Sequence, residues 1–351
     1  MEHKDLQYTF ETGVYRPPSE GGSNSLLLRF TRNCPWNKCA FCAMYKTEKF
    51  EKRPVEEIKA DIDAMAAICD EIKEISLRHG ASGISREAVI EFLGRHPELE
   101  DHPGFSMLLS WLVSGGGTAF LQDANTMIMK TQDLVEALQH LRRKFPSIQR
   151  VTTYARSGTI ARKTPEELQS IREAGLDRLH IGLESGDDEL LKRIQKGADS
   201  DVHIKGGRKA VEAGFQVSEY WMPGLGGKDR WESHARETAR VLNQINPHYI
   251  RSRPFRPLPG TPMYEQYQEG TLRLLTPAQQ LQELRLTMQN LEVTSRVCFD
   301  HMANYWRGRS GGLLFTHDYE GYKFPEQKEH VLALIEDGLQ YGQKEPSFLG
   351  L

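Results

Sequence analysis

The hydrophobic pattern of this chain alternates between short apolar runs of strand length and longer segments with apolar residues at helical spacing. The expected strands cover residues 25–31, 118–122, 150–154, 178–183, 216–222 and 249–254. The expected helices that follow them cover residues 54–67, 131–144, 164–174, 187–195, 202–213 and 231–245. Such alternation is typical of a parallel sheet with right-handed crossovers. Six units predict an α/β fold, a partial (β/α)6 TIM-like barrel, although alternation alone also fits a doubly wound sheet.

Two segments interrupt this alternation. Residues 70–117 form a helical stretch that is too long for an ordinary connection, and we interpret it as a helical insertion. Residues 272–351, with expected helices at 277–291 and 327–341, are interpreted as a small C-terminal helical cap. Residues 1–24 end in the soft sequence PPSEGGSN and are expected to form an N-terminal arm. The predicted organisation is therefore an arm (1–24), a barrel domain (25–271) and a cap (272–351).

Composition narrows the class of protein. The 351 residues carry a net charge of -3, without the basic field that marks dedicated nucleic-acid binders, so nucleic acid is disfavoured as a partner. No apolar run reaches the roughly 18 residues of a membrane span, and the N-terminal sequence MEHKDLQYTFETG lacks a signal peptide. We therefore expect a soluble, cytoplasmic protein. Because its five cysteines are an odd number without an export signal, metal binding or redox chemistry is favoured over disulfides.

Three of these cysteines follow the first expected strand. Cys34, Cys39 and Cys42 have the spacing C-x4-C-x2-C, and they lie at the strand end where active sites of parallel barrels gather. Three soft ligands suit an iron–sulfur cluster with one iron left open, whereas a closed zinc site needs a fourth ligand. The alternative is zinc or an electron-transfer cluster completed by Cys69, Cys298 or a distant histidine. Otherwise Cys69 and Cys298 are interpreted as small buried hydrophobic residues.

With this loop the sequence resembles the radical S-adenosylmethionine (SAM) superfamily, over about residues 25–264. Within it, the chain is similar to a branch of Fe–S oxidoreductases related to oxygen-independent coproporphyrinogen oxidases and elongator-type proteins. The family pattern is C-x3-C-x2-C with an aromatic residue before the last cysteine, which Phe41 matches, and the first spacing here is longer by one residue. The resemblance implies a [4Fe–4S] cluster, SAM on the open iron, and a reductant such as flavodoxin or ferredoxin.

The same resemblance implies that SAM lies among side chains on the cysteine loop and at the ends of successive strands. These cofactor-binding candidates are Phe41, Asp123, Tyr154, Arg156, Glu184, Ser185 and Met222. Asp123 would accept hydrogen bonds from the SAM ammonium, and Arg156 would meet its carboxylate. Glu184 and Ser185 belong to a Gly-Leu-Glu-Ser-Gly segment that matches the family and would face the ribose or the methionyl part. The alternatives are a turn at Asp123, a surface charge at Arg156 and a helix cap at Ser185.

The resemblance therefore implies an enzyme that cleaves SAM reductively and forms a 5′-deoxyadenosyl radical, which abstracts hydrogen from an unidentified substrate. Arg251 and Arg253, near the end of the sixth strand, are candidates for binding an acidic group of that substrate. His301 and Asn304 resemble a segment of related proteins, and a capping role is an equal alternative. Two other functions stay open: a coproporphyrinogen-oxidase-like or haem-handling protein, and a non-catalytic Fe–S or zinc-binding interaction protein.

Overall fold

The structure is a computed structural model that describes residues 8–13 and 25–343 of the chain. These residues divide into two compact units. The first contains the described residues up to 35, together with 49–154 and 166–178. The second contains 36–48, 155–165 and the described residues from 179 onward. Within the described residues, no helix is both long and apolar enough to cross a membrane.

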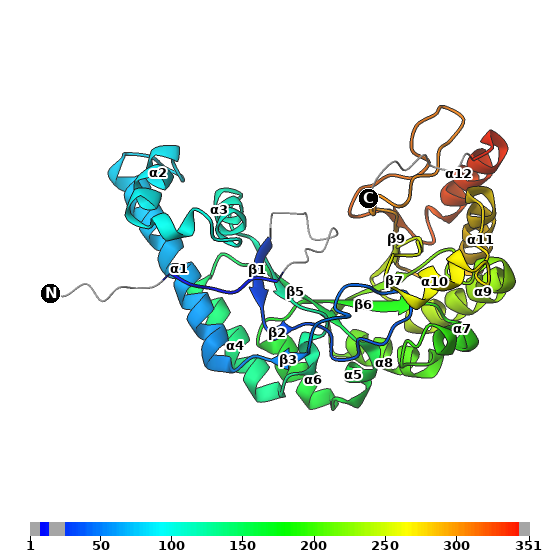
Figure 1. Cartoon of the computed structure of the whole chain (residues 1–351), viewed down its shortest axis with the longest axis horizontal. Coiled ribbons are helices and arrows are strands. Elements are labelled where there is room, and N and C mark those ends of the chain that lie inside the picture. The colour runs from blue at the N-terminus through cyan, green and yellow to red at the C-terminus, as the bar shows by residue number, and fades with distance from the viewer. Residues whose placement is uncertain (1–7, 14–24, 344–351) are drawn as a thin grey trace. The chain divides into compact units, whose positions relative to one another are not determined.

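The first unit is built on three parallel strands in the order β1-β4-β5 (Figure 1). Its strands are β1 (Ser25–Arg29), β2 (Thr31–Arg32), β3 (Glu51–Lys52), β4 (Thr118–Gln122) and β5 (Arg150–Ala155). Its helices are α1 (Val55–Arg78), α2 (Arg86–Arg95), α3 (Phe105–Val113), α4 (Thr131–Lys144) and α6 (Pro165–Glu173), with the 3-10 helices η3 (Pro97–Leu99) and η4 (Thr126–Ile128). Helix α1 packs on α4 and, through its other contacts, on α2 and α3.

Helix α1 continues beyond residue 67, where the sequence pattern predicted its end. Ile68, Ile72 and Ile75 extend its apolar face by another two turns, and all three are buried. The stretch 70–117 therefore holds the end of α1 together with α2, η3 and α3, which agrees with the helical character predicted for it.

The second unit holds strands in the order β6-β7-β8-β9-β10. These strands are β6 (Arg178–Glu184), β7 (Gln216–Trp221), β8 (Tyr249–Ser252), β9 (Arg296–Cys298) and β10 (Tyr322–Lys323). Its helices are α5 (Ser157–Arg162), α7 (Asp188–Arg193), α8 (Ser200–Glu212), α9 (Gly227–Ile245), α10 (Pro262–Gln268), α11 (Pro277–Asn290) and α12 (Lys328–Tyr341). Figure 1 shows α9, α11 and α12 side by side, and they share one apolar core with β7 and β8.

Every strand of the six predicted strand–helix units is present, and the printed pairings among β1, β4, β5, β7 and β8 are parallel. This confirms the predicted α/β class with the strand–helix alternation of a partial (β/α)6 barrel. The region after residue 271 differs from a purely helical cap, because β9 pairs parallel with β8 and β10 pairs antiparallel with β9. These strands of three and two residues are too short to produce a recognisable alternation in the sequence.

Candidate active site

The segment that carries the three cysteines begins in the first unit, where β2 and β3 pair antiparallel at its base. Asp123, directly after β4, is 3% exposed. One oxygen of its carboxylate accepts hydrogen bonds from Arg29 Nε at 2.8 Å and from the backbone N–H of Asn33 at 2.9 Å. Because Asn33 precedes Cys34, Asp123 anchors the entry to the cysteine segment. Its contact with the SAM ammonium stays a prediction.

Residues 36–48 of this segment lie in the second unit, against the ends of two helices. The backbone N–H of Ala40 donates to the carbonyl oxygen of Ile194, after α7, at 2.9 Å. The carbonyl oxygen of Ala40 accepts the N–H of Met263 in α10 at 3.1 Å. Ala40 is itself 3% exposed, so the backbone next to Cys39 is fixed on both sides.

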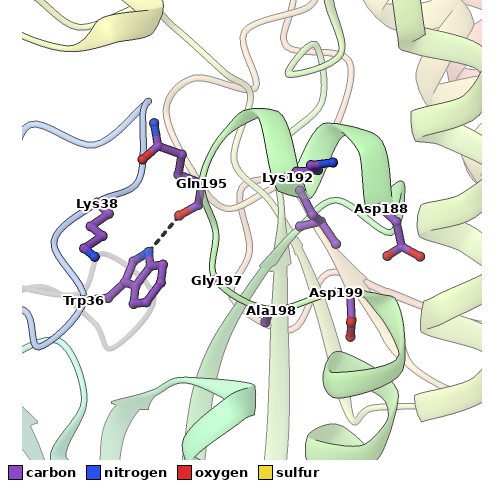
Figure 2. A pocket seen from close by; sticks show the side chains of 9 residues that line it. Trp36, Lys38, Asp188, Lys192, Gln195, Gly197, Ala198 and Asp199 are labelled. Carbon is purple, nitrogen blue, oxygen red and sulfur yellow. Dashed lines mark hydrogen bonds between the residues drawn. The ribbon is translucent and has the colours of Figure 1, made fainter.

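Trp36 is the main side-chain anchor of the cysteine segment in the second unit. Its indole Nε1 donates to the carbonyl oxygen of Gln195 at 2.7 Å, as Figure 2 shows. Its ring lies against Gly197, where an added Cβ would stand only 2.3 Å from Trp36 Cζ2. The Arg156 guanidinium lies 5.3 Å from the centre of the same ring. Gly197 has φ +72°, so both the backbone and the indole require glycine there.

A pocket of about 410 Å³ opens beside Trp36 (Figure 2). Lys38, from the same segment, and Lys192, on α7, contribute cations to its lining, while Asp188 and Asp199 contribute carboxylates. None of the SAM contacts predicted from the sequence lines this pocket, although Arg156 lies over the ring of Trp36 in its lining.

The five cysteines form no disulfides in the described part of the chain, and they fall into two groups. Cys69 and Cys298 are 0% exposed, and burial raises the pKa of both thiols to about 12. Such protonated thiols are poor metal ligands, which supports their interpretation as small apolar residues. Cys34 and Cys42 are half-buried, while Cys39 is buried.

The donor set of Cys34, Cys39 and Cys42 is chemically suited to iron–sulfur ligation, because three cysteines on one segment supply the soft donors that such clusters use. Among the residues that the structure describes, no three His, Cys, Asp or Glu side chains are grouped so as to hold a metal ion. The assignment of these three cysteines as ligands stays a prediction.

Glu184, the last residue of β6, forms an ion pair with Lys196. The Glu184 Oε1 to Lys196 Nζ distance is 2.8 Å, and the two side chains are 14% and 9% exposed. Glu184 adopts φ +63°, a left-handed conformation that is uncommon outside glycine. A Cβ on Gly182 would lie 2.2 Å from Glu184 Oε1, so glycine at that position makes room for the pair. Strained residues of this kind concentrate at functional sites.

Lys196 connects Glu184 to two further groups. Its carbonyl oxygen accepts Arg156 Nη2 at 2.6 Å, which brings the predicted Arg156 and Glu184 into one network. Glu219 on β7 is 0% exposed, and burial raises the pKa of its carboxyl well above the ordinary value, with Lys196 opposing and Glu184 adding to the shift. Burial thus favours the neutral form of the Glu219 carboxyl.

Ser185 is fully buried, and its hydroxyl is engaged within the protein. It accepts the N–H of Asp187 at 3.0 Å and lies 2.8 Å from His234 Nδ1 on α9. His234 Nε2 donates to the carbonyl oxygen of Met222 at 3.1 Å. Burial lowers the pKa of His234 to about 4, so the ring is neutral, which agrees with one accepting and one donating nitrogen. Ser185 thus connects the end of β6 to the loop after β7.

Met222 begins that loop, and Glu283 on α11 supports it from the other side. The Met222 N–H donates to the carbonyl oxygen of Glu184 at 3.0 Å. Glu283 Oε1 accepts the N–H of Gly224 at 2.8 Å and lies 3.5 Å from His234 Nε2. Phe41 and Met222 pack against one apolar cluster, which also contains Ala40 of the cysteine segment, so the structure brings these two predicted residues to the same place.

Tyr154, in the first unit, has a different environment. Its ring lies 5.1 Å from the ring of Phe120 in an edge-on arrangement, within a small apolar cluster that includes Leu27 and Met107. The structure therefore gives Tyr154 a packing contact on β4, and its predicted contact with SAM stays a prediction.

Sequence reasoning missed several residues of these networks. Lys196, His234 and Glu283 are separated in the chain from the groups they contact by 12, 49 and 59 residues. Nothing in their local sequence distinguishes them from ordinary helix or loop positions. Trp36 stood inside the C-x4-C spacing, and its aromatic character was the one signal that could have indicated an anchor.

Known structures with a similar fold include three proteins that this chain partly matches. An Elp3 from the archaeon Methanocaldococcus infernus, with an N-terminal deletion, has a TM-score of 0.47 and 14% identity over 70% of this chain and 60% of its own. Methylornithine synthase (PylB) has a TM-score of 0.43 and 17% identity over 79% and 66%. Coproporphyrinogen III oxidase (HemN) from Escherichia coli has a TM-score of 0.40 and 16% identity over 49% and 39%. This chain thus spans less than two thirds of each, and TM-scores this low establish nothing about its activity.

No curated protein sequence matches the chain significantly. The family model described as the radical SAM superfamily, however, matches residues 112–239. This stretch contains β4 to β7 and most of α9, and with them Asp123, Arg156, Glu184 and Met222, whereas the three cysteines lie outside it. Residues 112–239 of the chain are therefore similar to the radical SAM superfamily of enzymes, on an α/β fold with strand–helix alternation.

Proposed function

We propose that this chain holds a [4Fe–4S] cluster through Cys34, Cys39 and Cys42, and cleaves SAM reductively to form a 5′-deoxyadenosyl radical that abstracts hydrogen from its substrate. The match of residues 112–239 to the radical SAM superfamily model supports SAM-cleaving radical chemistry in general. The observation that carries the finer proposal is the group of three cysteines at C-x4-C-x2-C spacing, shortly after β1, the first strand of the sheet. When bound, the reduced cluster would supply the electron that cleaves SAM.

The chain's own residues would position SAM. Phe41 and Met222 offer an apolar surface next to Ala40, which suits the adenine. The Glu184 carboxylate, held by Lys196, would accept hydrogen bonds from ribose hydroxyls. Arg156 would face the SAM carboxylate and Asp123 its ammonium, with Tyr154 on the same rim. The buried hydroxyl of Ser185 is engaged by His234, so its role would be to orient Glu184 rather than to touch SAM.

Two further aspects belong to this proposal. The electron would come from a small reductant protein such as flavodoxin or ferredoxin. The enzyme would work in the cytoplasm, where reductants of this kind are present. The substrate is the part of the reaction that these residues do not name.

The test is anaerobic reconstitution of the full chain with iron and sulfide, followed by iron and sulfide assays, electron paramagnetic resonance and a SAM-cleavage assay with dithionite. We expect a four-iron cluster, and 5′-deoxyadenosine and methionine as products. Cys34→Ala, Cys39→Ala and Cys42→Ala should each lose the cluster. Cys69→Ala and Cys298→Ala are matched controls, because both thiols are fully buried and should leave the cluster intact.

Two outcomes would contradict the proposal. A Cys39→Ala protein that keeps a four-iron cluster would remove the ligand assignment. A protein that binds zinc in place of iron, or yields no 5′-deoxyadenosine with dithionite and SAM, would favour the non-catalytic alternative.

A further inference from the structure

Polar residues follow β8 and β9 where these two strands end. The strands pair parallel, with Arg251 opposite Cys298, so their C-terminal ends lie at one edge of the sheet. β8 continues into Arg253, and β9 continues into Asp300 and His301. Ligands of open α/β sheets bind at the carboxyl ends of strands, which makes this edge a place to search for substrate-binding groups.

The turn after β9 is fixed to the end of β8 by Asn304, which is 0% exposed. Asn304 Nδ2 donates to the carbonyl oxygen of Ser252 at 3.2 Å, and Ser252 Oγ donates to Asn304 Oδ1 at 2.7 Å. The N–H of Asn304 donates to the carbonyl oxygen of His301 at 2.9 Å. These bonds hold His301 next to the residues that follow Ser252, of which Arg253 is the first.

Arg251 belongs to the framework of this edge. It is 0% exposed, and its Nη1 lies 3.1 Å from Asp300 Oδ2. Its Nε donates to Ser218 Oγ at 3.1 Å, and its Nη1 donates to the carbonyl oxygen of Tyr319 at 3.2 Å. The Asp300 carboxylate is thereby committed to Arg251, so it does not neutralise the other arginines of this edge.

Arg253 differs from Arg251, because its cation has no carboxylate partner among the described ion pairs. Its guanidinium lies 4.8 Å from the centre of the Tyr220 ring. Its Nη1 is buried and has no hydrogen-bond acceptor within the part of the chain that the structure describes. Stacking on an aromatic ring fixes the guanidinium plane and leaves its N–H edge for a planar or tetrahedral oxyanion. A buried N–H without an acceptor is unfavourable until such a ligand binds.

Two other groups complete the arrangement. The Arg256 guanidinium lies 4.9 Å from the centre of the ring of Tyr305, the residue that follows Asn304. His301 Nδ1 accepts the N–H of Ala303 at 3.2 Å, which leaves its proton on Nε2 as a donor. Burial, assisted by Arg253, lowers the pKa of His301 to about 4, so this ring stays a neutral donor at pH 7.

We propose that the ends of β8 and β9 bind an oxyanion of the substrate, a carboxylate or a phosphate, with Arg253 as its principal partner and Arg256 and His301 Nε2 as flanking donors. The assignment of this anion to the substrate rests on the proposed radical SAM function. The existence of the anion site does not, because it depends on Arg253 and its neighbours alone.

The test is isothermal titration calorimetry of the full chain with two probes, inorganic phosphate and succinate, at low salt. Phosphate and carboxylate are separated by which probe binds more tightly. Arg253→Gln should weaken binding of the preferred probe at least about tenfold, since a charge-assisted bidentate contact is lost. The affinity of Arg253→Lys should lie between those of the parent protein and Arg253→Gln, because lysine keeps the charge but lacks the two parallel N–H donors of the guanidinium. Arg240→Gln is the matched control: it removes an exposed arginine of the same unit and should bind like the parent protein.

The proposal is overturned if neither probe binds the parent protein, or if Arg253→Gln binds as tightly as Arg240→Gln. Should Arg253→Gln not fold, phenylglyoxal modification of the parent protein serves instead, read by mass spectrometry at Arg253. Protection of Arg253 by the preferred probe supports the site, and equal labelling with and without probe overturns it.

The two proposals fail separately. Arg253-dependent anion binding by a protein that forms no cluster would leave the anion site standing without the radical SAM function. SAM cleavage by a protein that binds no anion would support the radical SAM function and overturn the anion site.

Discussion

Replacing Glu283 with glutamine is expected to stabilise the protein at neutral pH, although Glu283 supports a loop of the candidate active site. Glu283 is 1% exposed, and its Oε1 accepts the N–H of Gly224 at 2.8 Å. Its Oε2 is buried without a hydrogen-bond partner among the described residues. Burial raises the pKa of this carboxyl from 4.5 to about 8. At pH 7 it is therefore protonated in the folded protein and ionised in the unfolded chain.

The magnitude follows from the linkage of protonation to folding. Below pH 4.5 the carboxyl is protonated in both the folded and the unfolded chain, so its ionisation does not change the free energy of unfolding. As the pH rises from 4.5 towards 8, the carboxyl ionises in the unfolded chain only. This ionisation lowers the free energy of unfolding by about 1.4 kcal/mol per pH unit. The interval from 4.5 to 7 therefore removes about 3 kcal/mol of stability. Glutamine keeps an oxygen that accepts the N–H of Gly224 and does not ionise in the unfolded chain. Glu283→Gln should therefore recover most of this lost stability at pH 7.

The assay is urea unfolding of the cluster-free, reduced protein, followed by circular dichroism at pH 5, 6 and 7. The gain of Glu283→Gln over the parent protein should grow steadily across this range, from under about 1 kcal/mol at pH 5 to about 3 kcal/mol at pH 7. Glu237→Gln is the matched control, because Glu237 is an exposed partner of Arg240 and should change stability by less than about 1 kcal/mol at every pH. A difference between Glu283→Gln and the parent protein that is the same at pH 5 and pH 7 would refute the reasoning.

Two further predictions concern the cysteine segment and Glu184. Gly197→Ala places a methyl group against the Trp36 ring and should lower the iron content after reconstitution. Gly214→Ala is the control: Gly214 has φ +81° and nothing within 4 Å of an added Cβ, so the variant carries only the backbone cost of about 1 kcal/mol. Equal iron content in both variants would argue against Trp36 as an anchor. Lys196→Met leaves a nearly buried carboxylate without its cation and should destabilise by about 3 kcal/mol in urea unfolding. Lys59→Met, which removes an exposed ion pair, should lose much less stability than Lys196→Met, and a similar loss in both variants would contradict this account.

The fold could be predicted from the sequence wherever a segment was long enough to show its period. The helix expected at 131–144 is α4 with the same bounds, and each of the six expected strands is present. The prediction failed where the pattern is short or where it fades gradually. β9 and β10 have three and two residues, and α1 exceeds its expected end because its apolar face continues through Ile75.

The candidate site was predictable only in its residue types at strand ends. The sequence singled out Asp123 and Ser185, yet it gave no indication that Asp123 accepts the N–H of Asn33, 90 residues away, or that Ser185 lies against His234. Such contacts depend on packing between distant segments, and packing leaves no local signature in the chain. For Arg251 and Arg253 the sequence suggested one shared role, whereas burial gives Arg251 to Asp300 and leaves Arg253 for a ligand.

Strands β9 and β10 bear on whether the C-terminal region could be removed. β9 covers the edge of β8, and Val297 and Phe324 share a core with Trp221 and Ile250. A fragment ending at residue 271 would present a bare strand edge and lose most of that core, a combination that promotes aggregation. We therefore expect such a fragment to be insoluble on expression, and a protease to release no stable piece by cutting near residue 271. Residues 272–351 would then be required for the rest of the chain to fold.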